Sequence, residues 1–218
     1  TFHPGAADSD QLVLIGHGVT GNKDRPIVVA VAEAIASLGI PVLRFSFAGN
    51  GESGGKFEDC TISKEVDDLG SILDAVGPKS VLYIGHSMGG AVGTLRTAND
   101  SRIKALVSLA GMVHTQAFSD REFGMETPGE GFMWEEPSCP LSQAYVDNMA
   151  AIKSVADKAA AIRIPWLFVH GTEDDVVPVQ DTEDVLAIST DNKEFLKVDG
   201  ADHVFSGEHQ QPTASKVA

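Results

Sequence analysis

Residues 81–90, which read Val-Leu-Tyr-Ile-Gly-His-Ser-Met-Gly-Gly, constrain the fold more than any other part of the chain. An apolar, strand-like run meets a helix-compatible run here with no linker, so the backbone must turn sharply. Gly85 and Gly89, two residues before and two after Ser87, remove the Cβ atoms that would clash in such a turn. The pattern G-x-S-x-G therefore predicts that Ser87 lies at the tip of a turn between a strand and a helix, with its hydroxyl exposed.

A helix that begins at Met88 would direct its free N–H groups and the positive end of its dipole toward negative charge that develops beside Ser87. A serine nucleophile needs this arrangement, and we interpret Ser87 as one. The alternative is a glycine-rich turn without chemistry, because short motifs of this kind also arise by chance. The nucleophile hypothesis therefore requires a base and an acid elsewhere in the chain.

Strand-like and helix-like segments alternate along the chain. This alternation predicts an α/β fold with a doubly wound, mostly parallel sheet and right-handed crossovers. Apolar runs predict strands over 11–15, 41–46, 80–86, 103–110, 164–170 and 193–198, and residues 2–5 read as the end of a further strand. Helical periodicity predicts helices over 26–38, 61–76, 88–98, 146–162 and 179–188, and another from about 212.

The regular alternation stops between residues 112 and 145. Because this segment follows a strand, it should lie over the carboxyl edge of the sheet, where open α/β sheets bind ligands. We therefore expect one domain over residues 1–218 with a short insertion, or lid, at 112–145. The alternative is an irregular connection whose aromatic side chains only pack on the core. Its large apolar residues are Phe118, Phe123, Met125, Phe132, Met133 and Trp134.

Charge and composition argue against several classes of protein. Acidic residues outnumber basic ones by 31 to 16, and a net charge of −15 repels nucleic acid and anionic lipid. No apolar run approaches the roughly 20 residues that a membrane-spanning helix needs. Cys60 and Cys139 have no metal-ligand spacing, so the sequence suggests neither a disulfide framework nor a zinc site. No motif of the chain implies a cofactor. Nothing at Thr1 resembles a signal peptide, which favours a cytoplasmic location, although the chain begins without Met and a removed leader would change this prediction.

Four loops that carry reactive groups each follow an expected strand. Strands of a parallel sheet end on one side, so Val19, Ser87, Asp174 and His203 should meet at one edge despite their separation in sequence. The reactive side chains occur in the order serine, acid, histidine.

Four motifs together resemble serine hydrolases of the α/β-hydrolase superfamily, over residues 12–203. Residues 17–23 (HGVTGNK) resemble the oxyanion loop of cinnamoyl (feruloyl) esterases and of monoacylglycerol-lipase-like relatives, and 45–54 (FSFAGNGESG) resemble their glycine-rich loop. Residues 171–178 (GTEDDVVP) match the acid loop G-x-x-D-x-V-V-P, and 200–203 (GADH) match the histidine loop G-A-x-H.

The resemblance implies a role for each of these residues. Ser87 would attack a carbonyl carbon, His203 would take up its proton, and Asp174 would hold the imidazole. The backbone N–H groups of Val19 and Met88 would bind the oxyanion. Many esterases of this group carry an aromatic residue at the position of Val19, so the backbone donor is kept while the neighbouring pocket differs.

Other titratable groups compete for these roles. Asp175 would be the acid if the loop is read one residue later, but the spacing to the following Val-Val-Pro favours Asp174. His17, His86 and His170 flank strand ends, and we interpret them as hydrogen-bonding residues that shape loops. The histidines at positions 3, 114 and 209 have no supporting context.

The combined prediction is a metal-free serine carboxylesterase that forms an acyl-enzyme on small or medium acyl or aryl esters. The resemblance leaves monoacylglycerol lipase, thioesterase and aminopeptidase-like amidase open on the same triad, because fold does not choose among them. The serine at position 87 disfavours dehalogenases and epoxide hydrolases of the superfamily, which carry an aspartate at that position. A noncatalytic small-molecule-binding module is the alternative from a different class. The expected partner is a small-molecule ester, and the sequence specifies no oligomeric state.

Overall fold

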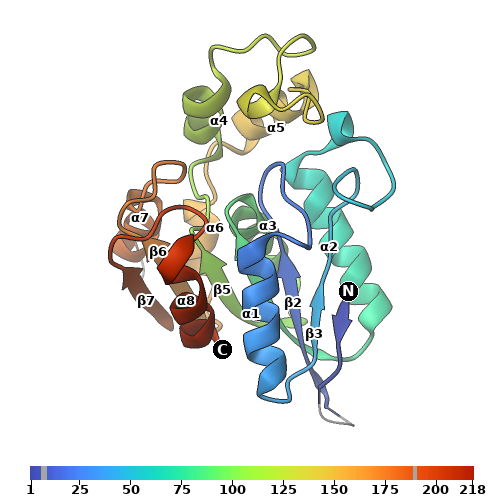
Figure 1. Cartoon of the computed structure of the whole chain (residues 1–218), viewed down its shortest axis with the longest axis vertical. Helices are drawn as coiled ribbons and strands as arrows, with labels where there is room; N and C mark the ends of the chain where they lie inside the picture. Colours follow the sequence, from blue (N-terminus) through green and yellow to red (C-terminus); the bar gives the residue numbers. More distant parts are fainter. Residues whose placement is uncertain (6–8, 189–190) are drawn as a thin grey trace.

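A seven-stranded sheet crosses the molecule (Figure 1). The computed structural model describes residues 1–5, 9–188 and 191–218. The strands are β1 (Phe2–His3), β2 (Gln11–Gly16), β3 (Val42–Arg44), β4 (Ser80–His86), β5 (Ile103–Leu109), β6 (Trp166–Gly171) and β7 (Lys193–Val198). Their order is β1-β3-β2-β4-β5-β6-β7, and all neighbours run parallel except β1 and β3. The expected α/β fold with a mostly parallel sheet is confirmed.

Helices cover both faces of this sheet (Figure 1). They are α1 (Pro26–Ser37), α2 (Ile62–Val76), α3 (Met88–Thr97), α4 (Thr115–Phe123), α5 (Gln143–Ile152), α6 (Ala156–Ala161), α7 (Gln180–Ile188) and α8 (Gln210–Val217), with short 3-10 helices η1 (Phe57–Asp59), η2 (Met133–Glu135) and η3 (Gly207–His209). Helices α1 and α8 pack together on one face, whereas α2, α3, α6 and α7 cover the other.

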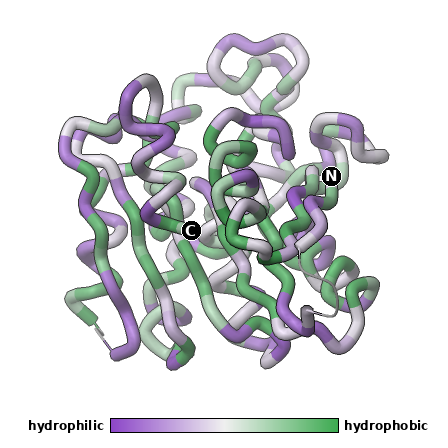
Figure 2. Tube along the Cα trace, turned by 60° about the horizontal axis from the view of Figure 1, so that its bottom comes forward, coloured by the Kyte–Doolittle hydropathy of each residue, from purple (hydrophilic) through white to green (hydrophobic). Residues whose placement is uncertain are grey.

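Strand β2 contributes to two hydrophobic cores at once. Leu12 and Leu14 face the core beneath α2 and α3, while Val13 and Ile15 face the core beneath α1 and α8. Side chains alternate along a strand, so a strand covered on both faces is apolar at successive positions. Figure 2 shows the central strands in green, the colour of hydrophobic residues. The continuous apolar runs of the sequence therefore reflect a sheet buried on both sides.

The sheet changes its direction of growth between β2 and β4. From β2 the chain moves outward to β3, and from β3 it crosses back to β4 before adding β5, β6 and β7 in turn. Such a reversal opens a crevice at the carboxyl ends of the strands. The loops after β2, β4, β6 and β7 all leave from this edge, and they carry the four residues singled out in the sequence.

The structure differs from the sequence prediction near residues 146–162. One helix was expected there, but α5 and α6 are separate and Lys153 between them has φ 60°. The backbone N–H of Val155 donates to the carbonyl of Val113 at 2.9 Å, and that of Gln116 donates to the carbonyl of Lys153 at 3.2 Å. These long-range bonds fix the break, which an alanine-rich sequence does not reveal.

Two further boundaries differ. The segment expected to be irregular contains the nine-residue helix α4, which lies with α5 above the carboxyl edge of the sheet in the upper part of Figure 1. Strand β3 spans three residues instead of six. Beyond it, the N–H of Phe45 reaches the carbonyl of Ile15 at 3.4 Å, so pairing weakens as the chain leaves the sheet.

Candidate active site

Ser87 lies at the sharp turn between β4 and α3, with φ 55° and ψ −121°. A non-glycine residue adopts this conformation at a cost, so the surroundings must hold it in place. A Cβ atom at position 85 would lie 2.2 Å from the carbonyl oxygen of Gly89, and one at position 89 would lie 2.7 Å from that of His17. Both glycines of the motif are therefore required for the chain to close this turn.

His203 and Asp174 are joined by a hydrogen bond between the loops after β7 and β6. The Nδ1 atom of His203 lies 2.9 Å from Oδ2 and 3.1 Å from Oδ1 of Asp174. Burial alone would raise the pKa of Asp174, but hydrogen bonds from His170 and His203 outweigh it and hold the pKa well below its ordinary value. An ionised carboxylate only accepts, so Nδ1 of His203 carries the proton. The Nε2 lone pair of His203 is thereby left available to accept a proton.

Backbone groups also hold Asp174. Its Oδ1 accepts hydrogen bonds from the N–H groups of Val176 at 3.0 Å and Val177 at 2.8 Å. The buried ring of His170 donates from Nε2 to the carbonyl of Val177 at 2.8 Å and lies 3.2 Å from Oδ2 of Asp174. Asp175, the rival acid of the sequence analysis, is exposed. The hydrogen-bond network therefore selects Asp174 as the partner of the histidine.

His86 connects the elbow directly to the histidine loop. Its Nε2 lies 3.0 Å from the carbonyl oxygen of His203, and the centroids of the two rings are 5.0 Å apart. Burial and the neighbouring His203 ring lower the pKa of His86 to about 3, so the ring is neutral and donates to the carbonyl. The residue before Ser87 thus fixes the backbone of His203.

The loop after β2 approaches the serine closely. A Cβ atom at Gly18 would lie 2.6 Å from Cβ and 3.0 Å from Oγ of Ser87, so glycine is needed there. The N–H of Gly21 closes a turn onto the carbonyl of Gly18 at 3.0 Å. Within the described residues, the N–H groups of Val19 and Met88 donate no hydrogen bond to protein groups. Both are therefore free to bind an anion.

His17 fixes the start of this loop. Its Nδ1 lies 2.8 Å from the carbonyl of Gly18, and its Nε2 accepts from the N–H of Phe47 at 3.1 Å. Burial lowers the pKa of His17 to about 4, so the ring is neutral at neutral pH, with its proton on Nδ1. The hydrogen-bonding role expected of His17, His86 and His170 agrees with these contacts.

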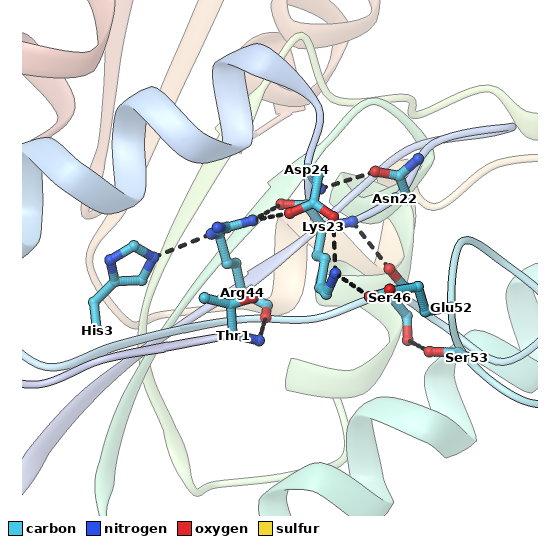
Figure 3. Close-up of polar contacts among 9 residues, drawn as sticks. All are labelled: Thr1, His3, Asn22, Lys23, Asp24, Arg44, Ser46, Glu52 and Ser53. Carbon is cyan, nitrogen blue, oxygen red and sulfur yellow. Dashed lines mark hydrogen bonds and ion pairs between the residues drawn. The ribbon is translucent and has the colours of Figure 1, made fainter.

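A network of polar contacts holds the far end of the loop (Figure 3). Lys23 donates from its backbone N–H to Oγ of Ser46 at 3.0 Å, and its ammonium group binds Glu52 at 2.7 Å. Arg44 donates to the carbonyl of Lys23 at 2.7 Å and forms an ion pair with Asp24. Exposed ion pairs contribute little stability, but the guanidinium is largely buried and ties the loop to β3.

A cavity of about 650 Å³ lies above the elbow. It is lined by Val19, Ser87 and His203, with Asp174 directly behind the histidine. Its other walls include Trp134 of the segment between β5 and α5, and Val176 of the acid loop. Most of the lining surface is apolar. The volume is in the range of small-molecule sites, about 300–1,000 Å³.

The described residues include no group of three or more His, Cys, Asp or Glu side chains placed to hold a metal ion. Cys60 and Cys139 are both free and buried.

Two buried acids are not among the residues predicted from the sequence. Glu65 of α2 is 1% exposed and Asp181 of α7 is 7% exposed. Asp181 accepts hydrogen bonds from the N–H groups of Val113 at 2.7 Å and His114 at 3.0 Å, which anchors the segment after β5. Glu65 lies three residues after Ile62 and four before Leu69, on the buried stripe of its helix. This spacing is the sequence signal that Glu65 is buried. The sequence shows no comparable signal for Asp181.

Comparison with known proteins finds relatives over most of the chain. It is 28% identical to palmitoyl-protein thioesterase ABHD10, mitochondrial, from Bos taurus over 192 residues, 83% of this chain and 63% of that protein. It is 27% identical to the uncharacterized protein YfhR of Salmonella typhimurium over 216 residues, 88% of this chain and 65% of that protein. The chain therefore spans less than two thirds of the length of these relatives.

Solved structures share the whole fold. Est1E from Butyrivibrio proteoclasticus, with ferulic acid bound, superposes with a TM-score of 0.84 at 25% identity, covering 100% of this chain and 91% of that one. ABHD10 from mouse superposes with a TM-score of 0.78 at 21% identity, covering 99% of this chain and 90% of that one. At the latter identity the likeness supports the fold alone.

Within the described part of the chain, no helix has the length and apolar character needed to cross a membrane. The family model described as the alpha/beta hydrolase fold matches residues 11–136, more than half of the chain. This match agrees with the parallel sheet, the elbow and the structural neighbours. The chain therefore belongs to the alpha/beta hydrolase family, and within it resembles esterases.

Proposed function

We propose that this protein is a serine ester hydrolase that works through an acyl-enzyme intermediate. The observation that carries the proposal is one cavity that holds Ser87 on a strained elbow together with His203, whose Nδ1 is bound by Asp174. A serine hydroxyl is a poor nucleophile at neutral pH and needs an adjacent base held in the correct tautomer. Ser87, His203 and Asp174 supply these three parts.

The reaction proceeds in two halves. Oγ of Ser87 attacks the acyl carbon while its proton passes to Nε2 of His203, and the N–H groups of Val19 and Met88 bind the oxyanion. One such donor contributes about 3 kcal/mol to lowering the barrier. His203 then protonates the leaving oxygen as the carbon–oxygen bond breaks. Water, deprotonated by the same histidine, attacks the acyl-enzyme, and His203 returns that proton to Oγ of Ser87 as the bond to the acyl carbon breaks and the acid is released.

The apolar cavity suits a small or medium acyl or aryl group. Trp134, Val176 and Val204 contribute to its walls, and the N-terminal end of α1 lies at its rim. We further propose that the molecule is a single domain in which residues 112–145 act as a lid over this cavity. The likeness to Est1E, which binds ferulic acid, is consistent with an aryl group in the site.

Thioester hydrolysis is the second candidate function. It is favoured by 28% identity to palmitoyl-protein thioesterase ABHD10 over 83% of this chain. The same nucleophile attacks a thioester, and a thiolate leaves more easily than an alkoxide because it is less basic. That relative is named mitochondrial, so the cytoplasmic location expected from the sequence stays a prediction, which imaging of the tagged full-length protein checks.

The test is turnover of p-nitrophenyl acetate and butyrate by wild type and Ser87→Ala. We expect hydrolysis with a burst of p-nitrophenol, and a loss of at least about 1,000-fold in kcat in the variant. Ser101→Ala is the matched control, because Ser101 is exposed and lies outside both the proposed triad and the cavity lining. It should keep near wild-type rates.

The outcomes separate the alternatives. Wild-type rates equal to buffer would contradict the enzyme and favour a noncatalytic binding module. Equal rates in wild type and Ser87→Ala would contradict the nucleophile. Comparison of kcat/KM for butyryl N-acetylcysteamine, ethyl butyrate and an alanine p-nitroanilide then assigns the thioesterase, esterase or amidase.

A further inference from the structure

A second, much smaller cavity lies behind the loop that carries Val19. Its volume is about 10 Å³. A cavity must offer about 10–15 Å³ to hold one water molecule, so nothing larger than water fits. Val19 and Thr20 line both this cavity and the large one beside Ser87, and Met88 also lines the small one. The two residues proposed to bind the oxyanion therefore form part of its wall.

Two buried oxygen atoms with unmet hydrogen-bonding capacity belong to residues that line this small cavity. They are Oε2 of Glu65, on α2, and the hydroxyl of Tyr145, on α5, and neither has a hydrogen-bond partner among the described residues. The two residues are 1% and 2% exposed. Buried polar atoms in native proteins are satisfied by protein groups or by ordered water. Two such atoms around one water-sized space point to a bound molecule.

The surroundings of the cavity favour the neutral forms of its titratable groups. Burial, reinforced by Asp68, raises the pKa of Glu65 well above its ordinary value, which favours the protonated carboxyl. Burial also raises the pKa of Cys60 to about 12. The thiol of Cys60 donates to the carbonyl of Ala48 at 3.1 Å and accepts from the amide of Asn50 at 3.3 Å. The neighbouring polar groups are thus already paired, and the two free oxygens suit a neutral molecule that both donates and accepts.

We propose that this cavity holds one ordered water molecule that bridges the carboxyl of Glu65 and the hydroxyl of Tyr145. The water joins α2 to α5 directly behind the proposed oxyanion loop. Thr20 in that loop has φ 54°, a conformation that a non-glycine residue keeps only when its surroundings enforce it. Glu65 and Tyr145 are therefore positioning residues for the reaction. This role rests on the proposed function, whereas the water site does not.

The first test is a crystal structure of the wild-type chain at a resolution that shows ordered water. We expect density for one water within hydrogen-bond distance of both oxygens. Density for a direct contact between the two side chains, or for no molecule at all, would overturn the proposal. This readout needs no activity, so it stands even if the protein hydrolyses no ester.

The second test uses Glu65→Gln, Glu65→Leu and Tyr145→Phe. Gln keeps a donor and an acceptor of the same shape and should retain wild-type Tm and kcat. Leu and Phe each leave the water and the opposite oxygen with a missing partner, which should lower Tm by about 2 to 8 °C. The double variant Glu65→Leu/Tyr145→Phe should lower Tm no further than the larger single effect, because both changes disrupt one bridge.

Steady-state kinetics test whether Glu65 and Tyr145 act as positioning residues. Glu65→Leu and Tyr145→Phe should lower kcat for p-nitrophenyl acetate with little change in KM, by up to about 100-fold for a donor displaced by about 1 Å. Thr213→Val is the matched control, because it removes another unpartnered buried hydroxyl, on α8 and outside the lining of both cavities. It should leave kcat unchanged and leave Tm unchanged or higher.

A dry cavity gives the opposite pattern. Glu65→Leu would then raise Tm as Thr213→Val does, because it replaces an unsatisfied polar group with an apolar one, and kcat would not fall. That result would overturn the inference while leaving the proposed function intact. Absence of turnover in wild type would overturn the proposed function and the positioning role together. The Tm values of the single and double variants would still decide whether the cavity holds water.

Discussion

The neighbours of Asp174 hold its carboxylate in place and keep it ionised. It is fully buried, and its carboxylate accepts from two backbone N–H groups and from His203. The pKa of Asp174 lies well below its ordinary value despite burial, because these donors stabilise the charged form. A permanently ionised acid at this position keeps the proton of His203 on Nδ1 throughout the proposed reaction.

Replacement of this carboxylate should affect chemistry far more than substrate binding. In Asp174→Asn the amide can present an N–H toward His203 and favour the wrong tautomer, so we expect kcat for p-nitrophenyl butyrate to fall by on the order of 1,000-fold to 10,000-fold. Asp175→Asn is the matched control, because Asp175 is adjacent, exposed and outside the network. The reverse ranking of the two variants in steady-state kinetics would assign the acid to position 175.

At the scale of elements, the site depends on how closely two loops approach. The loop after β2 and the elbow after β4 meet because β2 and β4 are neighbouring parallel strands in register from Gln11–Ser80 to Gly16–Gly85. The contact leaves no space for a side chain at Gly18. Helix α3 begins immediately after Ser87, and Val19 of the other loop lines the cavity that holds Ser87.

Gly18→Ala tests this close approach. The added methyl group would lie 2.6 Å from Cβ of Ser87, so either the loop or the serine must move. A displacement of about 1 Å lowers the rate on the order of 100-fold, so we expect kcat to fall by at least that much. Tm should also fall. Gly54→Ala is the control, because a Cβ there has no atom within 4 Å. A Gly18→Ala variant as active as Gly54→Ala would contradict the closeness of the two loops to the reacting atoms.

At the scale of the whole molecule, the large cavity is lined both by loops at the carboxyl edge of the sheet and by the segment at residues 112–145. Trp134 reaches the cavity from η2 and donates from its indole N–H to Glu122 at 3.0 Å. Its ring lies 5.0 Å from that of Phe123, edge to face. Arg121 from the same segment donates to the carbonyl of Val176 in the acid loop. The segment is thus tied to the loop that holds Asp174.

Trp134→Ala should weaken binding of aryl and longer acyl groups. An aromatic contact is worth about 0.5–1.5 kcal/mol, so we expect KM for phenyl esters to rise by roughly 3-fold to 10-fold while kcat for acetate esters changes little. Met125→Ala is the control, because Met125 belongs to the same segment, is 97% exposed and lies outside the cavity lining. Equal effects of the two variants on KM would remove the support for residues 112–145 as a lid.

The sequence by itself determined the strands, the elbow and the order of the reactive residues. These depend on local physics: apolar runs form strands buried on both faces, Gly85 and Gly89 permit one sharp turn, and loops after parallel strands reach one edge. The hypothesis that Ser87, Asp174 and His203 form a triad needed no coordinates, because it rests on this physics together with the resemblance of the acid and histidine loops to those of serine hydrolases. Its catalytic assignment remains the proposal that the Ser87 variant tests.

Only the tertiary structure decided the features that depend on contacts between distant segments. The helix break at Lys153 is fixed by hydrogen bonds to residues 113 and 116, and the burial of Glu65 and Asp181 follows from what packs on α2 and α7. The spacing of Glu65 places it on the apolar stripe of α2, but the local sequence does not specify which element covers an acid on a helix. The small cavity behind Val19, formed where four separate stretches of the chain converge, exists for the same reason.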